Sequence, residues 1–256
     1  MSTSKEQNYG APWTREELIL AFDLYCRIPF RKTKASNPEV QRLAMLIKRT
    51  SASVARKLGN FGAFDPELKR RNISGLIHGS KLDREIWDEF HKNWNTLVLR
   101  ARNLRESLGG TPKDLIEIEF PKGPSEREIK GKQRIHQSFF RQAVLSSYEY
   151  TCCITGINIP ECLTASHIVP WSISEKYRTD PTNGLCLSAT FDRLFDNGLI
   201  TISNNLNVVI SGKLLKTSGP SYDLVCSYHM KPIIPPKRFL PSAERLKWHY
   251  ENIFLH

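Results

Sequence analysis

The sequence lacks any run of apolar residues long enough to cross a lipid bilayer, which takes about 18 consecutive positions. Its first residues, MSTSKEQNYG, also lack the apolar core of a secretory signal peptide. Both absences argue against a membrane-embedded or exported protein, so we expect a cytoplasmic protein with no membrane partner. Hydrophobic residues make up 40% of the 256 positions, which excludes global disorder and permits one large domain or two small ones.

Cysteine pairs of the CxxC type are missing too, although the chain has six cysteines. Without a secretion signal, we expect reduced thiols rather than disulfides. Cys153, Cys162 and Cys186, together with His229, leave an irregular zinc site as an alternative. Buried free thiols are the favoured interpretation, so structural zinc is not expected.

Acidic residues are the scarcer charged class, with 26 Asp and Glu against 37 Lys and Arg and a formal net charge of +11. Most of the excess lies in residues 1–134, which hold 26 basic and 17 acidic residues, whereas residues 135–256 hold 11 and 9. This distribution favours a polyanionic partner such as nucleic acid. A basic surface that is merely solvated is the alternative.

Helical periodicity predicts four helices in the first half of the chain. They cover residues 13–25, a segment that begins at Pro38, residues 51–60 and residues 82–99. Thr14 and Glu17 have the spacing of a capping box, and Asn37 before Pro38 is typical of a helix start. The fourth pattern places four apolar residues on one face: Ile86, Phe90, Trp94 and Leu97.

Two segments of this half, WTREEL and LIKRTSASVARKLGNF, resemble the Myb-like variety of helix-turn-helix. The resemblance implies a DNA-binding module with its reading helix in the second segment. Ser53, Arg56 and Lys57 would face the DNA, because Val54 and Leu58 face inward. A plain helical bundle with solvated basic residues is the alternative interpretation.

A change of composition predicts the domain boundary. Residues 106–133 are rich in glycine, proline and charge, and contain one short strand-like run at 115–120. We therefore predict a helical module over residues 1–105, a linker over 106–133 and a second domain over 134–256.

The second domain mixes helices and strands, so the fold class is α+β. We predict a helix at 134–148, strands at TCCITG, Leu163–Val169, LITIS and NVVIS, and a closing C-terminal helix. A short helix in SATFDRLFDNG would be stopped by Asn197-Gly198. Asn204-Asn205 predicts a turn between the last two strands.

Three polar residues of this domain have the chemistry that phosphodiester hydrolysis needs, namely a base, a cation ligand and a group that orients the base. His167 lies on an apolar strand just before Pro170, and Asn183 follows in a loop. Asp192 lies on the short helix, with Asp196 one turn later. Imidazole is largely neutral at pH 7, and carboxylate oxygens suit Mg²⁺. Separately, each residue also has an ordinary structural interpretation.

The segments CITG, ASHIVPW, DPTNGLCL, FDRLFDNGLITIS and LKWHYENIF together resemble the HNH, or ββα-metal, endonucleases, in particular the restriction-type branch. The resemblance covers roughly residues 134–256. It implies a metal-dependent DNA endonuclease with His167 as general base, Asn183 fixing the loop, and Asp192 as metal ligand. Asp196 is implied as a second ligand or a structural residue. The expected cofactor is a divalent ion, Mg²⁺ or Mn²⁺.

The same resemblance implies double-stranded DNA as substrate and a restriction or defence role. Lys176, Arg178 and Arg193 lie near the site in sequence and are candidate phosphate contacts. A homodimer or two successive nicks would cut both strands.

Two features depart from the family pattern. Ser166 stands directly before His167, where many members have Asp or His as a further metal ligand, and the structural CxxC pairs of several members are missing. A non-catalytic DNA-binding protein on an HNH scaffold therefore stays open as an alternative. So does a nonspecific nuclease toxin or effector.

Overall fold

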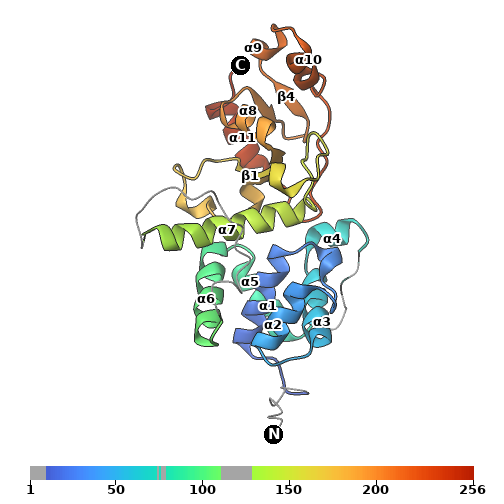
Figure 1. The fold of residues 1–256 in the computed structure, drawn as a ribbon, viewed down its shortest axis with the longest axis vertical. Helices are drawn as coiled ribbons and strands as arrows, with labels where there is room; N and C mark the ends of the chain where they lie inside the picture. The colour runs from blue at the N-terminus through green and yellow to red at the C-terminus, as the bar shows by residue number, and fades with distance from the viewer. Residues whose placement is uncertain (1–9, 74, 76–78, 111–128) are drawn as a thin grey trace. The chain divides into compact units, whose positions relative to one another are not determined.

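The computed structural model describes residues 10–73, 75, 79–110 and 129–256, with the side chains of 129–134 left aside (Figure 1). Packing divides the chain into two compact units, Met1–Gln142 and Ala143–His256, which we describe separately. The strand-like run at 115–120 and most of the predicted linker lie outside the described residues, so the predicted domain limits stay a prediction. None of the helices in the described segments is long and apolar enough to span a membrane.

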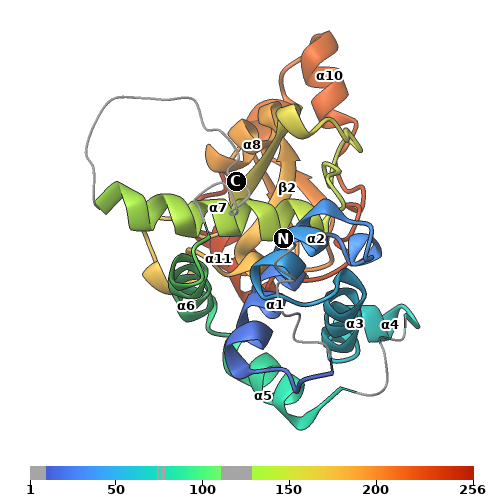
Figure 2. The same cartoon turned by 60° about the horizontal axis from the view of Figure 1, so that its bottom comes forward.

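The N-terminal unit is built from helices packed around α1 (Figure 2). In chain order they are α1 (Arg15–Arg27), η1 (Phe30–Lys32), α2 (Pro38–Leu46), α3 (Ser51–Gly62), α4 (Pro66–Arg70), α5 (Lys81–Phe90), α6 (Trp94–Ser107) and the first part of α7 (Ile129–Ser147). Helix α1 contacts α2, α3, α5 and α6. Every residue from Glu17 to Arg27 is buried, so α1 forms the centre of this core.

The helix starts predicted in this unit are confirmed. Thr14 and Glu17 form the capping box, each side chain bonding the other's backbone N–H. The Asn37 side chain caps α2, which has Pro38 at its first position. Thr50 caps α3 by accepting from the Ser53 N–H. Helices α2 and α3 pack directly on each other.

The single helix predicted over residues 82–99 is wrong, because two helices occupy this region. Helix α5 ends at Phe90 and α6 begins at Trp94. The chain turns between them, where the Asn93 N–H bonds the Phe90 carbonyl and Asn93 leaves helical geometry with φ −128° and ψ 57°. Apolar residues on both sides of the turn are buried, so the periodic pattern predicted burial correctly. It did not predict the turn, because no proline or glycine marks the end of α5.

The C-terminal unit contains two small antiparallel sheets, β1 with β2 and β3 with β4. Its elements are the end of α7, η3 (Pro160–Cys162), β1 (Leu163–His167), η4 (Glu175–Tyr177), η5 (Pro181–Asn183), β2 (Gly184–Ser188), α8 (Ala189–Asp196), β3 (Ile200–Ile202), β4 (Val208–Ile210), α9 (Gly212–Leu215), α10 (Pro220–Cys226) and α11 (Ala243–Asn252). Helix α8 packs against β1, β2 and β3, and α11 packs against β3. The unit thus presents a ββα arrangement of β1, β2 and α8.

The predicted strand at TCCITG is wrong, and β2 was not predicted. Residues 151–156 form a turn, in which the Gly156 N–H bonds the Cys152 carbonyl and Gly156 has φ +75°. The partner of β1 is instead Gly184–Ser188, with His167 opposite Gly184. All five residues of β2 are buried, so its apolar run lacks the polar alternation that marks an exposed strand.

The other elements predicted for this unit are present. Strands β3 and β4 flank a turn at Asn204-Asn205, and α7 and α11 cover the two predicted terminal helices. Gly198 ends α8 as predicted, with φ +68° and its N–H bonded to the Phe195 carbonyl. A Cβ at Gly198 would lie 2.0 Å from the Ile253 carbonyl oxygen, so the close approach of the C-terminal segment also requires glycine here.

Candidate active site

His167 is the last residue of β1, and its ring is held from two sides. Its Nε2 lies 3.1 Å from the backbone carbonyl oxygen of Arg178. The Trp171 ring stands edge-on to the imidazole, with the two centroids 5.6 Å apart. Both partners come from the long loop between β1 and β2, so the loop rather than the sheet orients the ring.

The contact with Arg178 determines the tautomer of His167. A carbonyl oxygen only accepts hydrogen bonds, so Nε2 must carry the proton and donate it. In the neutral ring the basic lone pair then lies on Nδ1. Burial lowers the pKa of His167 to about 4, against a smaller opposite effect of the bond to Arg178. At pH 7 the imidazole is therefore unprotonated and able to accept a proton.

Asn183 ties the end of β1 to the start of β2. The side chain is fully buried, and its Oδ1 accepts from the Val169 N–H at 2.9 Å. Its Nδ2 donates to the carbonyls of Val169 at 3.0 Å and Tyr177 at 3.3 Å, and its own carbonyl accepts from the Ile168 N–H. The amide thus crosslinks both ends of the loop that holds His167.

Asp192 and Asp196 project from α8, one turn apart. Partial burial, together with the negative charge of Asp192, raises the pKa of Asp196 to about 6, so the two carboxylates sense each other. Within the described segments, no three His, Cys, Asp or Glu side chains gather into a ready-made metal site. Mg²⁺ is commonly held by one or two carboxylates with water and substrate phosphate completing its shell, so this pair fits a divalent ion.

Ser166 precedes His167 on β1 and is 2% exposed. Successive side chains of a strand point to opposite faces, so Ser166 faces away from His167 and pairs with Leu185. Its Oγ is buried and makes no hydrogen bond among the described residues. Ser166 therefore offers no charged oxygen to a cation, and the carboxylates of α8 remain the candidate metal ligands.

Replacing Ser166 by alanine is expected to raise the free energy of unfolding by about 1 kcal/mol, because a buried hydroxyl without a partner is removed. DNA cleavage should stay unchanged. Urea unfolding and a cleavage assay on the same preparation measure both quantities. A large loss of cleavage in Ser166→Ala would instead assign Ser166 a role at the metal.

The three basic residues predicted near the site differ in how exposed they are and in how many protein groups they contact. Arg178 donates from Nε to the Trp171 carbonyl, pairs with Glu175 and lies over the Trp171 ring, so it mainly stabilises the loop. Lys176 and Arg193 are exposed. Of the three, these two keep a side chain accessible to phosphate.

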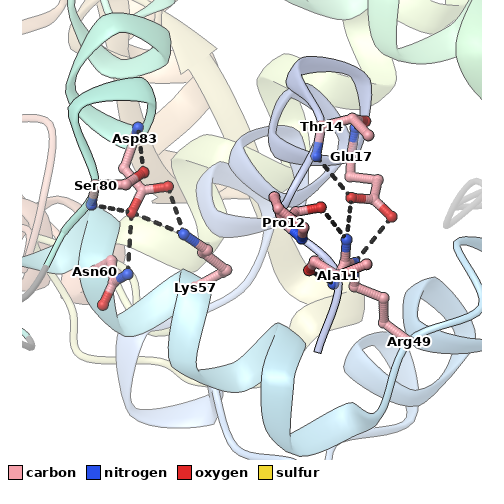
Figure 3. A network of polar contacts seen from close by, with 9 residues as sticks. All are labelled: Ala11, Pro12, Thr14, Glu17, Arg49, Lys57, Asn60, Ser80 and Asp83. Atoms are coloured by element: carbon pink, nitrogen blue, oxygen red, sulfur yellow. Dashed lines mark hydrogen bonds and ion pairs between the residues drawn. The ribbon is translucent and has the colours of Figure 1, made fainter. Parts of the chain in front are cut away.

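On the predicted reading helix α3, two of the three candidate side chains are at least partly exposed, and the third is engaged in an ion pair. Arg56 is exposed and Ser53 is half-buried. The Lys57 Nζ, by contrast, bonds both carboxylate oxygens of buried Asp83, at 2.9 and 3.0 Å (Figure 3). Asn60 donates to the same carboxylate. The charge of Lys57 is therefore neutralised within the unit.

A second buried pair stabilises the start of this unit. Arg49 donates from Nε and Nη2 to Glu17, and also bonds the backbone carbonyls of Ala11 and Pro12 (Figure 3). Arg49 is 7% exposed. The charge of Arg49, like that of Lys57, is paired with a carboxylate inside the unit and is therefore unavailable to a nucleic acid.

Cys153 lies beside Cys186, whose carbonyl accepts from the Cys153 N–H, but no three of the residues considered for zinc form a metal-binding group within the described segments. Cys162 is exposed, and the His229 Nδ1 accepts from the Ile210 N–H. Cys153 is buried, and burial raises its thiol pKa well above the usual value. All six cysteines are free thiols in the structure.

Two residues at the candidate site were not predicted, Arg245 and His249 of α11. Arg245 bonds Asp180 and Thr182 in the loop between β1 and β2. The His249 Nε2 lies 3.2 Å from the Phe195 carbonyl of α8. Arg245 had no signal in the sequence beyond its spacing of four from His249, which places both on one helix face. His249 lies in LKWHYENIF, one of the segments that resemble the HNH family.

The candidate site lies within a segment that matches a known protein family. A family model described as HNH endonuclease matches residues 152–203, which include His167, Asn183, Asp192 and Asp196. No curated protein sequence matches the chain. Among solved structures, the chain is similar to a modification dependent TagI restriction endonuclease, with 19% sequence identity and a TM-score of 0.33.

That similarity covers 44% of this chain and 37% of the other, and is too weak to assign a substrate. HNH endonucleases generally use a divalent metal ion, for which the two carboxylates of α8 are suitable ligands. Residues 152–203, which carry the candidate active site, match the HNH endonuclease family.

Proposed function

We propose that the protein is a metal-dependent DNA endonuclease in which His167 is the general base and Asp192 and Asp196 hold the metal. The observation that carries this proposal is the bond from the His167 Nε2–H to the Arg178 carbonyl. It leaves Nδ1 as the basic nitrogen within the matched HNH segment. Asn183 fixes the loop that supplies this carbonyl.

In the proposed reaction, His167 accepts a proton at Nδ1 from a water molecule aligned with the scissile phosphorus. The lowered pKa of His167 keeps the ring unprotonated before the reaction. A divalent ion, when bound, would stabilise the negative charge on the phosphate and on the departing 3′ oxygen. Asp192 and Asp196 would hold that ion, and the ends expected are a 5′-phosphate and a 3′-hydroxyl.

The N-terminal unit is proposed to bind the DNA and to contribute selectivity. Support comes from the contact of α2 with α3, the exposure of Arg56 on α3, and the excess of basic residues in this half of the chain. Lys176 and Arg193 are proposed phosphate contacts beside the nuclease site. Lys57 is the weakest of the proposed contacts, because Asp83 neutralises its charge.

A nuclease that carries its own DNA-binding unit suits restriction or defence, which we propose as its biological role. The test is cleavage of plasmid and of modified and unmodified phage DNA with Mg²⁺ or Mn²⁺. Discrete fragments support a sequence-specific restriction enzyme, whereas a smear supports a nonspecific effector. No cleavage of any of these DNAs with either ion would contradict the proposal and favour a DNA-binding scaffold.

Asp192→Asn is expected to raise the Mn²⁺ concentration needed for half-maximal cleavage by at least about tenfold, because one charged ligand is lost. Asp196→Asn should act in the same direction, and a double variant should be inactive. Calorimetric titration with Mn²⁺ checks the loss of binding directly. Asp223→Asn on exposed α10 is the matched control and should titrate like the wild type.

A further inference from the structure

Helix α11 lies beyond the matched HNH segment, yet it contacts two parts of the candidate active site. Arg245 and His249 are four residues apart, so they leave the same face of the helix. Arg245 reaches the loop between β1 and β2, and His249 reaches α8. The two halves of the site are therefore held by one helix.

Arg245 binds the loop between β1 and β2 through two hydrogen bonds and one cation–π contact. Its Nη2 donates to Asp180 Oδ2 at 2.6 Å, and its Nη1 donates to Thr182 Oγ1 at 2.7 Å. The guanidinium carbon lies 4.1 Å from the centre of the Tyr177 ring. The Arg245 side chain is 12% exposed. A forked donor stacked on a ring sets both the distance and the orientation of its partners, which a lysine ammonium would not.

The gripped residues adjoin the groups that orient the imidazole. Tyr177 directly precedes Arg178, whose carbonyl accepts the bond from His167. Thr182 directly precedes Asn183, whose amide bonds the Tyr177 carbonyl. The Thr182 carbonyl also accepts from the N–H of Ser242, the residue before α11. Arg245 thus holds the loop segment that determines the His167 tautomer.

His249 contacts the end of α8 through a hydrogen bond and ring stacking. Its Nε2–H donates to the Phe195 carbonyl at 3.2 Å, and its Nδ1 accepts from the Thr201 hydroxyl at 2.8 Å. The ring stacks on Phe195 with centroids 3.8 Å apart, and His249 is 1% exposed. Phe195 directly precedes Asp196, so the last turn of α8 is fixed where its second carboxylate projects.

We infer that Arg245 and His249 are positioning residues of the nuclease, Arg245 for the base His167 and His249 for the carboxylates of α8. The inference rests on the roles proposed above for His167, Asp192 and Asp196. Neither residue touches the reacting groups. Each acts by restricting the segment that carries them, and small displacements of catalytic groups cost rate steeply.

The Arg245 part is tested with Arg245→Ala, Arg245→Lys and the control Lys247→Ala, an exposed residue of the same helix. Arg245→Ala is expected to lower kcat for DNA cleavage by about 10–100-fold with KM nearly unchanged. The kcat of Arg245→Lys should lie between those of the wild type and Arg245→Ala, because lysine keeps the charge but loses the two-pronged guanidinium. Lys247→Ala should match the wild type. If Arg245→Ala does not fold, Arg245→Lys carries the test.

A second readout needs neither metal nor DNA. ¹⁵N NMR of the imidazole is expected to show only the Nε2–H tautomer of His167 in the wild type and a mixture in Arg245→Ala. If Arg245→Ala lowers the melting temperature while kcat and the tautomer stay unchanged, the role is merely structural and the inference is overturned. Should the wild type cut no DNA, the proposed function fails while this tautomer measurement still decides the Arg245 part.

The His249 part is tested with His249→Phe, which keeps an aromatic ring on Phe195 but loses both hydrogen bonds. Calorimetric titration with Mn²⁺ alone is expected to show binding weakened by about tenfold or more, the size of effect known for residues that orient metal ligands. The His167 tautomer should be unaffected. Unchanged Mn²⁺ binding in a folded His249→Phe protein would overturn this part.

Discussion

Replacement of His167 by alanine is expected to lower the rate of DNA cleavage by about 10²–10⁴-fold, the contribution typical of a general base. The ring lies at the end of β1 with its Nε2–H donating to the Arg178 carbonyl, so Nδ1 is the nitrogen that would accept the proton. Single-turnover cleavage of plasmid DNA at saturating Mn²⁺ measures the effect. Circular dichroism of the same sample reports whether the fold is retained.

The matched control is His256→Ala, because His256 is exposed near the end of the chain. It should cleave like the wild type. The pKa of His167, lowered to about 4 by burial, also predicts the pH dependence of the base. The ring is unprotonated above this pKa, so protonation of His167 should not limit cleavage until the pH falls toward 4. A folded His167→Ala protein that cuts within a few-fold of the wild-type rate would remove His167 from the mechanism.

Replacement of Asn183 by alanine is expected to lower the free energy of unfolding by about 3–5 kcal/mol. Two buried backbone groups, the N–H and the carbonyl of Val169, and the half-buried carbonyl of Tyr177 would each lose a partner. Leaving a buried donor or acceptor unpaired costs about 1–3 kcal/mol. Urea unfolding measures the total, and amide hydrogen exchange at Val169 reports the local opening.

The same substitution should also lower the rate of DNA cleavage. If the loop stays folded, we expect a rate between those of the wild type and His167→Ala. Only if the loop unfolds do we expect a rate below that of His167→Ala. The control is Asn205→Ala, an exposed asparagine in the turn between β3 and β4. It should change stability by less than about 0.5 kcal/mol. Retention of wild-type stability and Val169 protection in Asn183→Ala would show that the amide does not hold the loop.

Elements governed by neighbouring residues were predicted from the sequence alone. The capping box at Thr14 and Glu17 needs only contacts three residues apart, and the stop of α8 needs only a glycine able to adopt φ +68°. These two predictions depend on local chemistry, which the order of residues expresses directly. The choice of His167, Asn183 and Asp192 had another basis, namely the resemblance of the segments that carry them to the HNH family.

The strand partner of β1 was not predictable by the same means. The dipeptide Asn183-Gly184 is typical of a turn, although Gly184 is already the first residue of β2. The uniform burial of β2 also removes the alternation that marks a half-exposed strand. The break between α5 and α6 also lacked a glycine or proline. In both places tertiary packing overrode the local pattern.

The sequence by itself determined which residue types occur at the nuclease site and in what order along the chain. Only the tertiary structure decided which contacts these and neighbouring residues make. Lys57 is neutralised by Asp83 from another helix, Ser166 is turned away from His167 by strand alternation, and Arg245 bonds Asp180 in the loop that contacts His167. Such contacts join segments far apart in sequence, and their energies depend on burial and geometry that only the folded chain creates.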